Sequence, residues 1–310
     1  MGSTLIDTST IERDYGVPEH LEHRLTLPDG RTLAVAEWGD PDGKPVITFH
    51  GTPGSRIGYW TDEPGIWQRF GLRRFTFDRP GYGESTRLAG RSVGDVVPDV
   101  VAIAEAFGLR RFAISGGSGG GPHVLACAAL IPERVVRCLA SVSVAPFDAE
   151  GVDFVAWMNE GNIREFGAAV EGESALRAVI EPTRDQMVER LTSGRADFLG
   201  DGYDMPEADQ IVMLKHQKAA AAHLLTAVAH GIDGWVDDDL AVTKPWGFDV
   251  ASCRVPIVLA YGRQDQLVPA VHGDWLAAHV PGAITWVDDA TGHMGSDEEM
   301  ERDLGWLRDG

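Results

Sequence analysis

Short apolar runs alternate with segments of helical period along most of this chain. Each run is four to ten residues long and is followed by a turn rich in glycine or proline. Strands that alternate with helices predict βαβ crossovers, and therefore a mostly parallel sheet with helices on both faces. The predicted strands lie at 45–49, 74–77, 112–115, 135–144, 256–261 and 284–287.

The pattern differs at the start of the chain and in its middle. Segments 23–27 and 31–38 flank Pro28-Asp29-Gly30 and predict a β-hairpin, and the residues before it are predicted to be a poorly ordered or loosely docked lead-in. From 146 to 250 the β-branched runs give way to helical periods, and the strand pattern then resumes. We therefore predict an insertion rather than a tandem domain. The predicted organisation is a lead-in at 1–22, an α/β core at 23–145 and 251–310, and a helical insertion at 146–250.

The remaining helices are predicted in the core. They lie at 56–70, from Ser92 to Phe107, within 112–130 after the third strand, at 269–279 and at 298–307. Ser92 with Asp95 resembles a capping box at the start of its helix, and Gly108 is placed to end it.

Charge and composition restrict the possible partners. The net charge of −20 opposes binding to nucleic acid or to an anionic membrane. We expect a small-molecule substrate, and a monomer or homodimer. Residues 147–250 carry 20 acidic and 8 basic side chains, which indicates a solvated acidic surface or, alternatively, a site that attracts cations. Three widely spaced cysteines, no bilayer-length apolar run and no signal-peptide pattern predict a cytoplasmic protein.

The segment from Phe112 to Leu130 carries the strongest chemical signal. A buried strand leads into Gly116-Gly117-Ser118-Gly119-Gly120, and an alanine-rich helix follows. Strand, G-x-S-x-G and helix in this order predict a nucleophile elbow, in which a sharp turn lifts the serine hydroxyl above the sheet. The flanking glycines, Gly117 among them, allow the neighbouring elements to approach closely. A phosphate-binding or purely structural turn is the alternative.

A catalytic serine needs a base and an acid that orients the base. His293 follows the last strand and a glycine, and it stands last in the order Ser, Asp, His. Asp265 lies in the loop after the strand 256–261, between Ser118 and His293 in the sequence, and we predict it as the orienting acid. The rival histidines are His50 and His123. The rival acids are Asp78, Asp288 and Asp289.

The oxyanion formed in acyl transfer needs backbone N–H donors. Gly119 directly follows the nucleophile, and the loop after the strand 45–49 is placed to supply the second donor. Within that loop we predict Thr52 as the donor, because Pro53 has no N–H. His50 is expected to shape the loop, and Gly51 to let it turn. A structural βα turn is the alternative for this loop.

Together these motifs resemble the α/β-hydrolase fold family. The resemblance spans roughly residues 23–145 and 251–308. It implies that Ser118 is the nucleophile, Asp265 the acid and His293 the base, and that the insertion forms a helical cap. A further stretch within the insertion, GWVDDDLAVTKPWGFD, is similar to a segment of many uncharacterised capped hydrolases. The motifs are HGTPG (50–54), DRPGYGES (78–85), GGSGG (116–120), GRQDQLVP (262–269) and GHM (292–294).

Two departures from related enzymes narrow the function. Ser118 stands where epoxide hydrolases and haloalkane dehalogenases of this fold have an aspartate, and Thr52 replaces the second glycine of the HGGPG that proline iminopeptidases usually carry. That second departure weakens the peptidase interpretation, although acidic cap residues such as Glu160 and Glu165 could hold a substrate amine.

We predict a serine hydrolase of small, largely apolar esters, lactones or amides, with no cofactor or metal. An aminopeptidase-like amide hydrolase, a lyase, a carbon–carbon bond hydrolase, an acyl transferase and a ligand receptor with a slow triad are the alternatives. Trp157, Met158 and Phe166 are expected in the wall of the substrate pocket.

Overall fold

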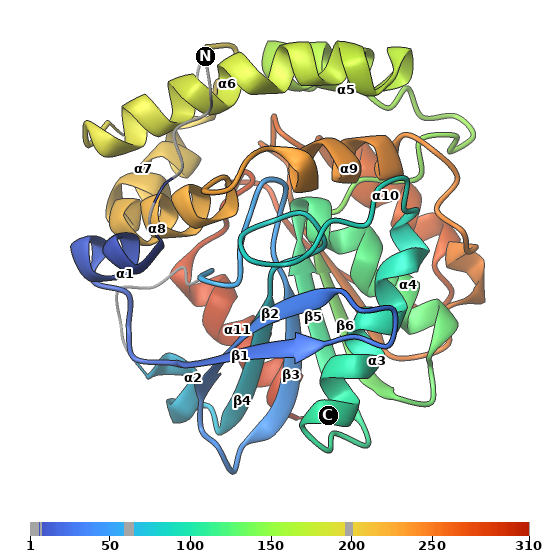
Figure 1. The fold of residues 1–310 in the computed structure, drawn as a ribbon. Helices are drawn as coiled ribbons and strands as arrows, with labels where there is room; N and C mark the ends of the chain where they lie inside the picture. The colour runs from blue at the N-terminus through green and yellow to red at the C-terminus, as the bar shows by residue number, and fades with distance from the viewer. Residues whose placement is uncertain (1–5, 7, 59–64, 196–200, 310) are drawn as a thin grey trace.

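One eight-stranded sheet organises the computed structural model, which describes residues 6, 8–58, 65–195 and 201–309 (Figure 1). The strand order is β1-β2-β4-β3-β5-β6-β7-β8. Pairs from β4 to β8 are parallel, and β1–β2 and β2–β4 are antiparallel. The predicted fold class is thereby confirmed. The strands are β1 (Leu21–Thr26), β2 (Thr32–Gly39), β3 (Lys44–Phe49), β4 (Leu72–Phe77), β5 (Phe112–Gly117), β6 (Val135–Ser141), β7 (Ile257–Gly262) and β8 (Ile284–Asp288).

Helices cover both faces of this sheet. Side chains of α3, α4 and α10 join the core on one face, and those of α2 and α11 pack on the other. Successive side chains of a strand point to opposite faces of the sheet, so each strand contributes to both cores. On β3, for example, Ile47 packs on the first face and Val46 on the second. The helices are α1 (Thr8–Tyr15), α2 (Ile66–Arg69), α3 (Val97–Ala106), α4 (Gly121–Leu130), α5 (Glu160–Glu171), α6 (Glu173–Thr192), α7 (Glu207–Lys215), α8 (Gln217–Ala227), α9 (Asp233–Val242), α10 (Ala270–His279) and α11 (Asp297–Arg308).

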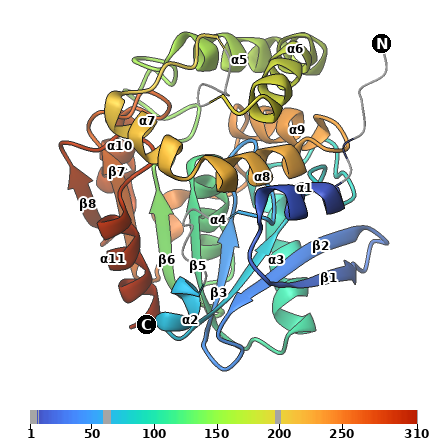
Figure 2. The ribbon, with the colours of Figure 1, turned by 90° about the vertical axis from the view of Figure 1, so that its left-hand side faces the viewer.

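Helices α5 to α9 lie between β6 and β7 in the sequence and form a layer beyond one end of the sheet; we call them the cap. The views in Figures 1 and 2 show α5 and α6 outermost, with α8 and α9 between them and the sheet. The cap has its own apolar core, built around residues such as Ile180, Leu225 and Trp235.

Several elements differ from the expectations. The lead-in contains α1, which packs on α8 and buries Ile11 in the cap core (Figure 2). Ile11 and Tyr15, four residues apart, lie on one side of this short helix and give it an apolar face. In the predicted helix 56–70 only α2 is helical among the described residues, and 59–64 lie outside them. In the run 152–157 no residue is helical, and 154–157 form a turn.

The predicted capping box is confirmed. Ser92 and Asp95 form the capping box, although it opens a 3₁₀ turn (Val93–Val96) that leads into α3. All three cysteines are buried and free. Within the described residues, no helix combines the length and the apolar character that crossing a bilayer requires.

Candidate active site

Ser118 lies at the sharp turn between β5 and α4. Its φ of 54° is in the left-handed region, which a residue with a side chain rarely adopts and which costs about 1–3 kcal/mol. The turn has no room for a larger residue at 119, because a Cβ there would lie 2.1 Å from Thr52 Oγ1. This strained, glycine-flanked geometry is what a nucleophile elbow requires.

His293 and Asp265 meet at the same edge of the sheet. His293 Nδ1 lies 2.7 Å from Asp265 Oδ2, and both side chains are almost fully buried. The other oxygen of Asp265 accepts the N–H groups of Leu267 and Val268, at 2.8 Å each, which fixes the carboxylate in its loop. Because Nδ1 faces the acid, Nε2 is the nitrogen left for a substrate or nucleophile.

The charge on the His293 ring is favoured by its surroundings. Burial alone lowers the pKa of His293, but the carboxylates of Asp265 and Asp209 outweigh it, so the pKa is raised above its ordinary value. The acidic neighbours therefore stabilise the imidazolium that a general base becomes.

Ser118 and His293 line one cavity of about 400 Å³ between the sheet edge and the cap. Among the hydrogen bonds of the described residues, none joins Ser118 Oγ to His293. In enzymes without substrate the hydrogen bond between nucleophile and base is often long and tightens when substrate binds. The lack of this bond here is therefore compatible with Ser118 as nucleophile and His293 as base.

The loop after β3 lies against Ser118. A Cβ placed on Gly51 would be 3.5 Å from Ser118 Cβ, and one placed on Gly119 would be 3.1 Å from the Thr52 nitrogen. In the described part of the chain the Thr52 N–H donates to no other group. A free N–H beside the serine is the feature that an oxyanion donor needs.

A buried carboxylate of the cap, Asp238 on α9, holds this loop from behind. Thr52 Oγ1 donates to Asp238 at 2.8 Å, and the Arg79 guanidinium bonds both Asp238 and the carbonyl oxygens of His50 and Gly51. Tyr82 and Arg91 also donate to Asp238, at 2.8 and 2.6 Å. Although burial opposes the charge, the two arginines hold the pKa of Asp238 well below its usual range. Sequence reasoning assigned no role to Arg79 or Asp238.

The rival histidines have structural contacts. His50 lies between the Gly51 carbonyl, 2.7 Å from Nδ1, and the Arg79 N–H, 3.0 Å from Nε2. Burial and the nearby Arg79 hold its pKa well below the ordinary value, so the ring is neutral and both nitrogens are occupied. His123 is fully buried in α4, with Nδ1 3.0 Å from the Val93 carbonyl oxygen.

The rival acids hold turns. Asp78 accepts the Arg56 N–H and guanidinium and the Glu84 N–H, and Asp288 accepts the N–H groups two and three residues ahead of it. The Asp289 backbone carbonyl accepts from the Gln264 side chain. None of these contacts, all between described residues, is to His293.

The expected wall residues divide between two places. Phe166 lines the cavity that holds Ser118, as do Gly51, Gly117 and His50. Trp157 and Met158 line a separate hollow that Asp265 also lines, and Trp157 is 84% exposed there. Their assignment to the wall of the Ser118 cavity is corrected: Trp157 lies in the turn 154–157 and is exposed, and Met158 is buried in the apolar core outside the lining of that cavity.

Two carboxyl groups lie side by side in the cap wall of the cavity. Glu165 on α5 accepts from Trp235 Nε1 at 2.6 Å and from the Tyr203 hydroxyl. Next to it, burial and then the charge of Glu165 raise the pKa of Asp239 well above its ordinary value, so Asp239 keeps a proton. No N–H or O–H donor of the described residues reaches Asp239 Oδ2.

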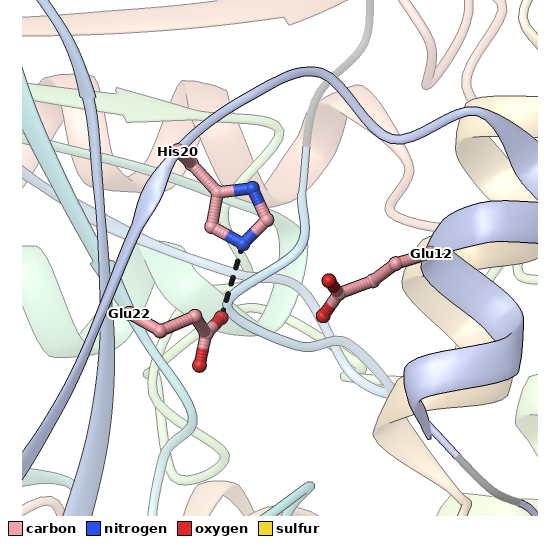
Figure 3. Close-up of side chains that lie close together, drawn as sticks. All are labelled: Glu12, His20 and Glu22. Atoms are coloured by element: carbon pink, nitrogen blue, oxygen red, sulfur yellow. Dashed lines mark hydrogen bonds and ion pairs between the residues drawn. The ribbon is translucent and has the colours of Figure 1, made fainter.

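A cluster of two glutamates and a histidine lies outside the cavity. Glu12, His20 and Glu22 place ligand-type atoms within 4.8 Å of one another, and Figure 3 shows His20 bonded to Glu22. Glu22 also accepts hydrogen bonds from Arg56 and Arg24. The second ring nitrogen of His20, Nδ1, lies 2.9 Å from the Pro18 carbonyl oxygen. Arg24 and Arg56 already neutralise the Glu22 carboxylate, and His20 has no ring nitrogen left to bind a metal, so the donor set does not fit a metal ion.

The sheet order, the strained serine and the His–Asp pair at the same edge define the α/β-hydrolase fold. A family model described as "alpha/beta hydrolase fold" matches residues 44–299. The chain belongs to this family.

Two curated relatives and one solved structure are similar to the chain. A non-heme chloroperoxidase of Streptomyces lividans is 27% identical over 250 residues, 79% of this chain and 83% of the relative. A proline iminopeptidase of Neisseria meningitidis serogroup A is 29% identical over 282 residues, 85% of this chain and 87% of the relative. An alpha/beta hydrolase fold protein from Chitinophaga pinensis matches with a TM-score of 0.67 at 16% identity, covers 94% of this chain and 98% of its own, and shows the fold alone.

Asp238→Asn is expected to destabilise the protein by about 3–5 kcal/mol at pH 7, because two buried arginines would lose their carboxylate. Urea unfolding measures this loss, and Asp204→Asn, at an exposed aspartate of the same region, is the matched control. Equal stability of Asp238→Asn and the control would contradict the role assigned to Asp238.

Proposed function

We propose that the protein is a cofactor-independent serine hydrolase of small, largely apolar esters, lactones or amides. The observation that carries the proposal is the convergence of three groups on one cavity: a serine in a strained turn, a buried His–Asp pair and a free N–H of the loop after β3. The cavity size and its apolar walls favour a small substrate. These walls include Val144, Phe166, Met213, Leu224, Val242 and Leu267.

In the proposed reaction Ser118 attacks the substrate carbonyl while His293 Nε2 removes the hydroxyl proton. Asp265 keeps the Nδ1 proton in place and stabilises the imidazolium. The N–H groups of Thr52 and Gly119 stabilise the negative oxygen of the tetrahedral intermediate. The imidazolium then protonates the leaving group. Water, deprotonated by the same histidine, finally hydrolyses the acyl-enzyme.

The acid pair in the cap wall favours a second candidate, an amide or ester hydrolase whose substrate carries an amino group. Asp239 Oδ2 has no donor among the described residues, and Glu165 lies next to it in the cavity wall, so a substrate ammonium entering the cavity could bind both carboxyl groups. Glu160, the other acid considered from the sequence, is exposed at the start of α5 and does not line the cavity.

Ser118→Ala is expected to lower turnover of p-nitrophenyl acetate or butyrate by about 10³-fold or more, by loss of the nucleophile. A fluorophosphonate should label the wild type at Ser118, as mass spectrometry of the digested protein would show. Equal inertness of wild type and Ser118→Ala, with a ligand still bound, would favour a receptor instead.

The pH dependence of kcat/KM is expected to report on His293. Because the base must be neutral, activity rises with pH through the pKa of His293, and the two carboxylates place that pKa above the ordinary value of about 6.5. The acid limb should therefore have its midpoint above about pH 6.5, and His293→Ala should abolish it. An acid limb unchanged in His293→Ala would exclude His293 as the base.

Glu165→Gln tests the second candidate. For an α-amino acid p-nitroanilide, loss of a bond to a charged group should lower kcat/KM by about 10–100-fold, whereas an N-acetylated counterpart should be little affected. Glu160→Gln, on the same helix but exposed, is the matched control. If Glu165→Gln lowers activity equally on both substrates, the cavity does not recognise the amine.

A further inference from the structure

The loop that carries His293 is held at both ends by one helix of the cap. This helix, α7, begins with its first turn above residues 293 and 294 and ends beside the start of α11. Figure 2 shows α7 on the side of the molecule where β8 and α11 lie. Residues more than 80 positions apart in the sequence therefore meet here.

Asp209 makes the contact at the first end. Its Oδ2 accepts the backbone N–H of His293 at 2.8 Å, and its Oδ1 accepts that of Met294 at 2.9 Å. The carboxylate is 1% exposed and needs the glycine at 292, because a Cβ there would be 2.4 Å from Asp209 Oδ2. Two bonds to consecutive N–H groups fix both the position and the direction of this peptide segment.

The second end is an ion pair. Lys215 at the end of α7 bonds Asp297, the first residue of α11, and His216 Nε2 lies 3.4 Å from the same carboxylate. The segment between these two contacts, 293–297, joins the His293 loop to the N-terminus of α11. A shift of α7 would thus move the backbone of the proposed base.

We propose that Asp209 is a positioning residue through which the cap sets the place of the general base His293 relative to Ser118. The proposal rests on the proposed serine hydrolase function, and it assigns the cap a part in catalysis in addition to covering the substrate. Met213, one helical turn beyond Asp209 on α7, lines the cavity. A substrate that contacts Met213 therefore contacts α7, the helix whose Asp209 holds the His293 backbone.

The Asp209 charge also acts on the ring. Asp265 from the loop after β7 and Asp209 from α7 are the charged groups that raise the pKa of His293 against the effect of burial. Removing the Asp209 charge should lower the pKa of His293. If Asp209 contributed only to the packing of the cap, its removal would leave the pKa of His293 unchanged.

The test compares Asp209→Asn with Glu207→Gln, an exposed acid in the same turn of α7, and with His293→Ala. Two rates are measured from pH 5 to 9: hydrolysis of p-nitrophenyl butyrate and labelling of Ser118 by a fluorophosphonate, which also needs the base. Circular dichroism and thermal unfolding report whether each variant is folded.

We expect Asp209→Asn to lower kcat by about 10–100-fold with KM changed less than about threefold, because a misplaced base affects the reaction more than binding. Its acid limb should move to lower pH in both assays, while Glu207→Gln behaves as the wild type. A wild-type rate and acid limb in Asp209→Asn would overturn the proposal, as would a lower rate with an unmoved limb. If His293→Ala itself stays active, the proposed function fails instead.

Discussion

Buried carboxylates of the cap hold the loops that bear the candidate chemistry. Asp238 binds the Thr52 hydroxyl and the arginine behind the loop after β3, and Asp209 binds the backbone of the His293 loop. Burying a carboxylate costs several kcal/mol unless donors replace its water, so each of these side chains is stable only with the core loop in place. The cap and the active-site loops therefore depend on each other, and cap placement is part of the site.

Three successive aspartates of α9 lie in three different environments. Successive side chains on a helix differ in direction by about 100°, so neighbours in the sequence face different surroundings. Asp237 accepts two bonds from Arg87, Asp238 faces the loop after β3, and Asp239 faces Glu165 in the cavity wall. The acidic excess of the cap is consequently not a solvated surface throughout, since all three carboxylates are buried.

The core was readable from the sequence because its signals are local. Apolar runs predicted the parallel strands, glycines on both sides of Ser118 predicted the turn, and chain order placed Asp265 and His293 after successive strands. These features depend on neighbouring residues and on the rule that parallel strands end at one edge. The close approach of His293 to Asp265 agrees with that reasoning.

Contacts between the cap and the core leave no comparable local pattern. Asp209 lies in a polar stretch, and nothing in its neighbours indicates that two N–H groups from residues 293 and 294 will reach it. The run of three aspartates next to apolar residues did carry a signal, because a buried helix must pair or neutralise its carboxyl groups. Trp157 shows the opposite error: a large apolar residue within the insertion predicts a pocket wall, but Trp157, in a turn with φ of 70°, lies at the surface. Such directions depend on how the cap packs on the core, where Asp209 and Asp238 bind loops that lie far away in the sequence.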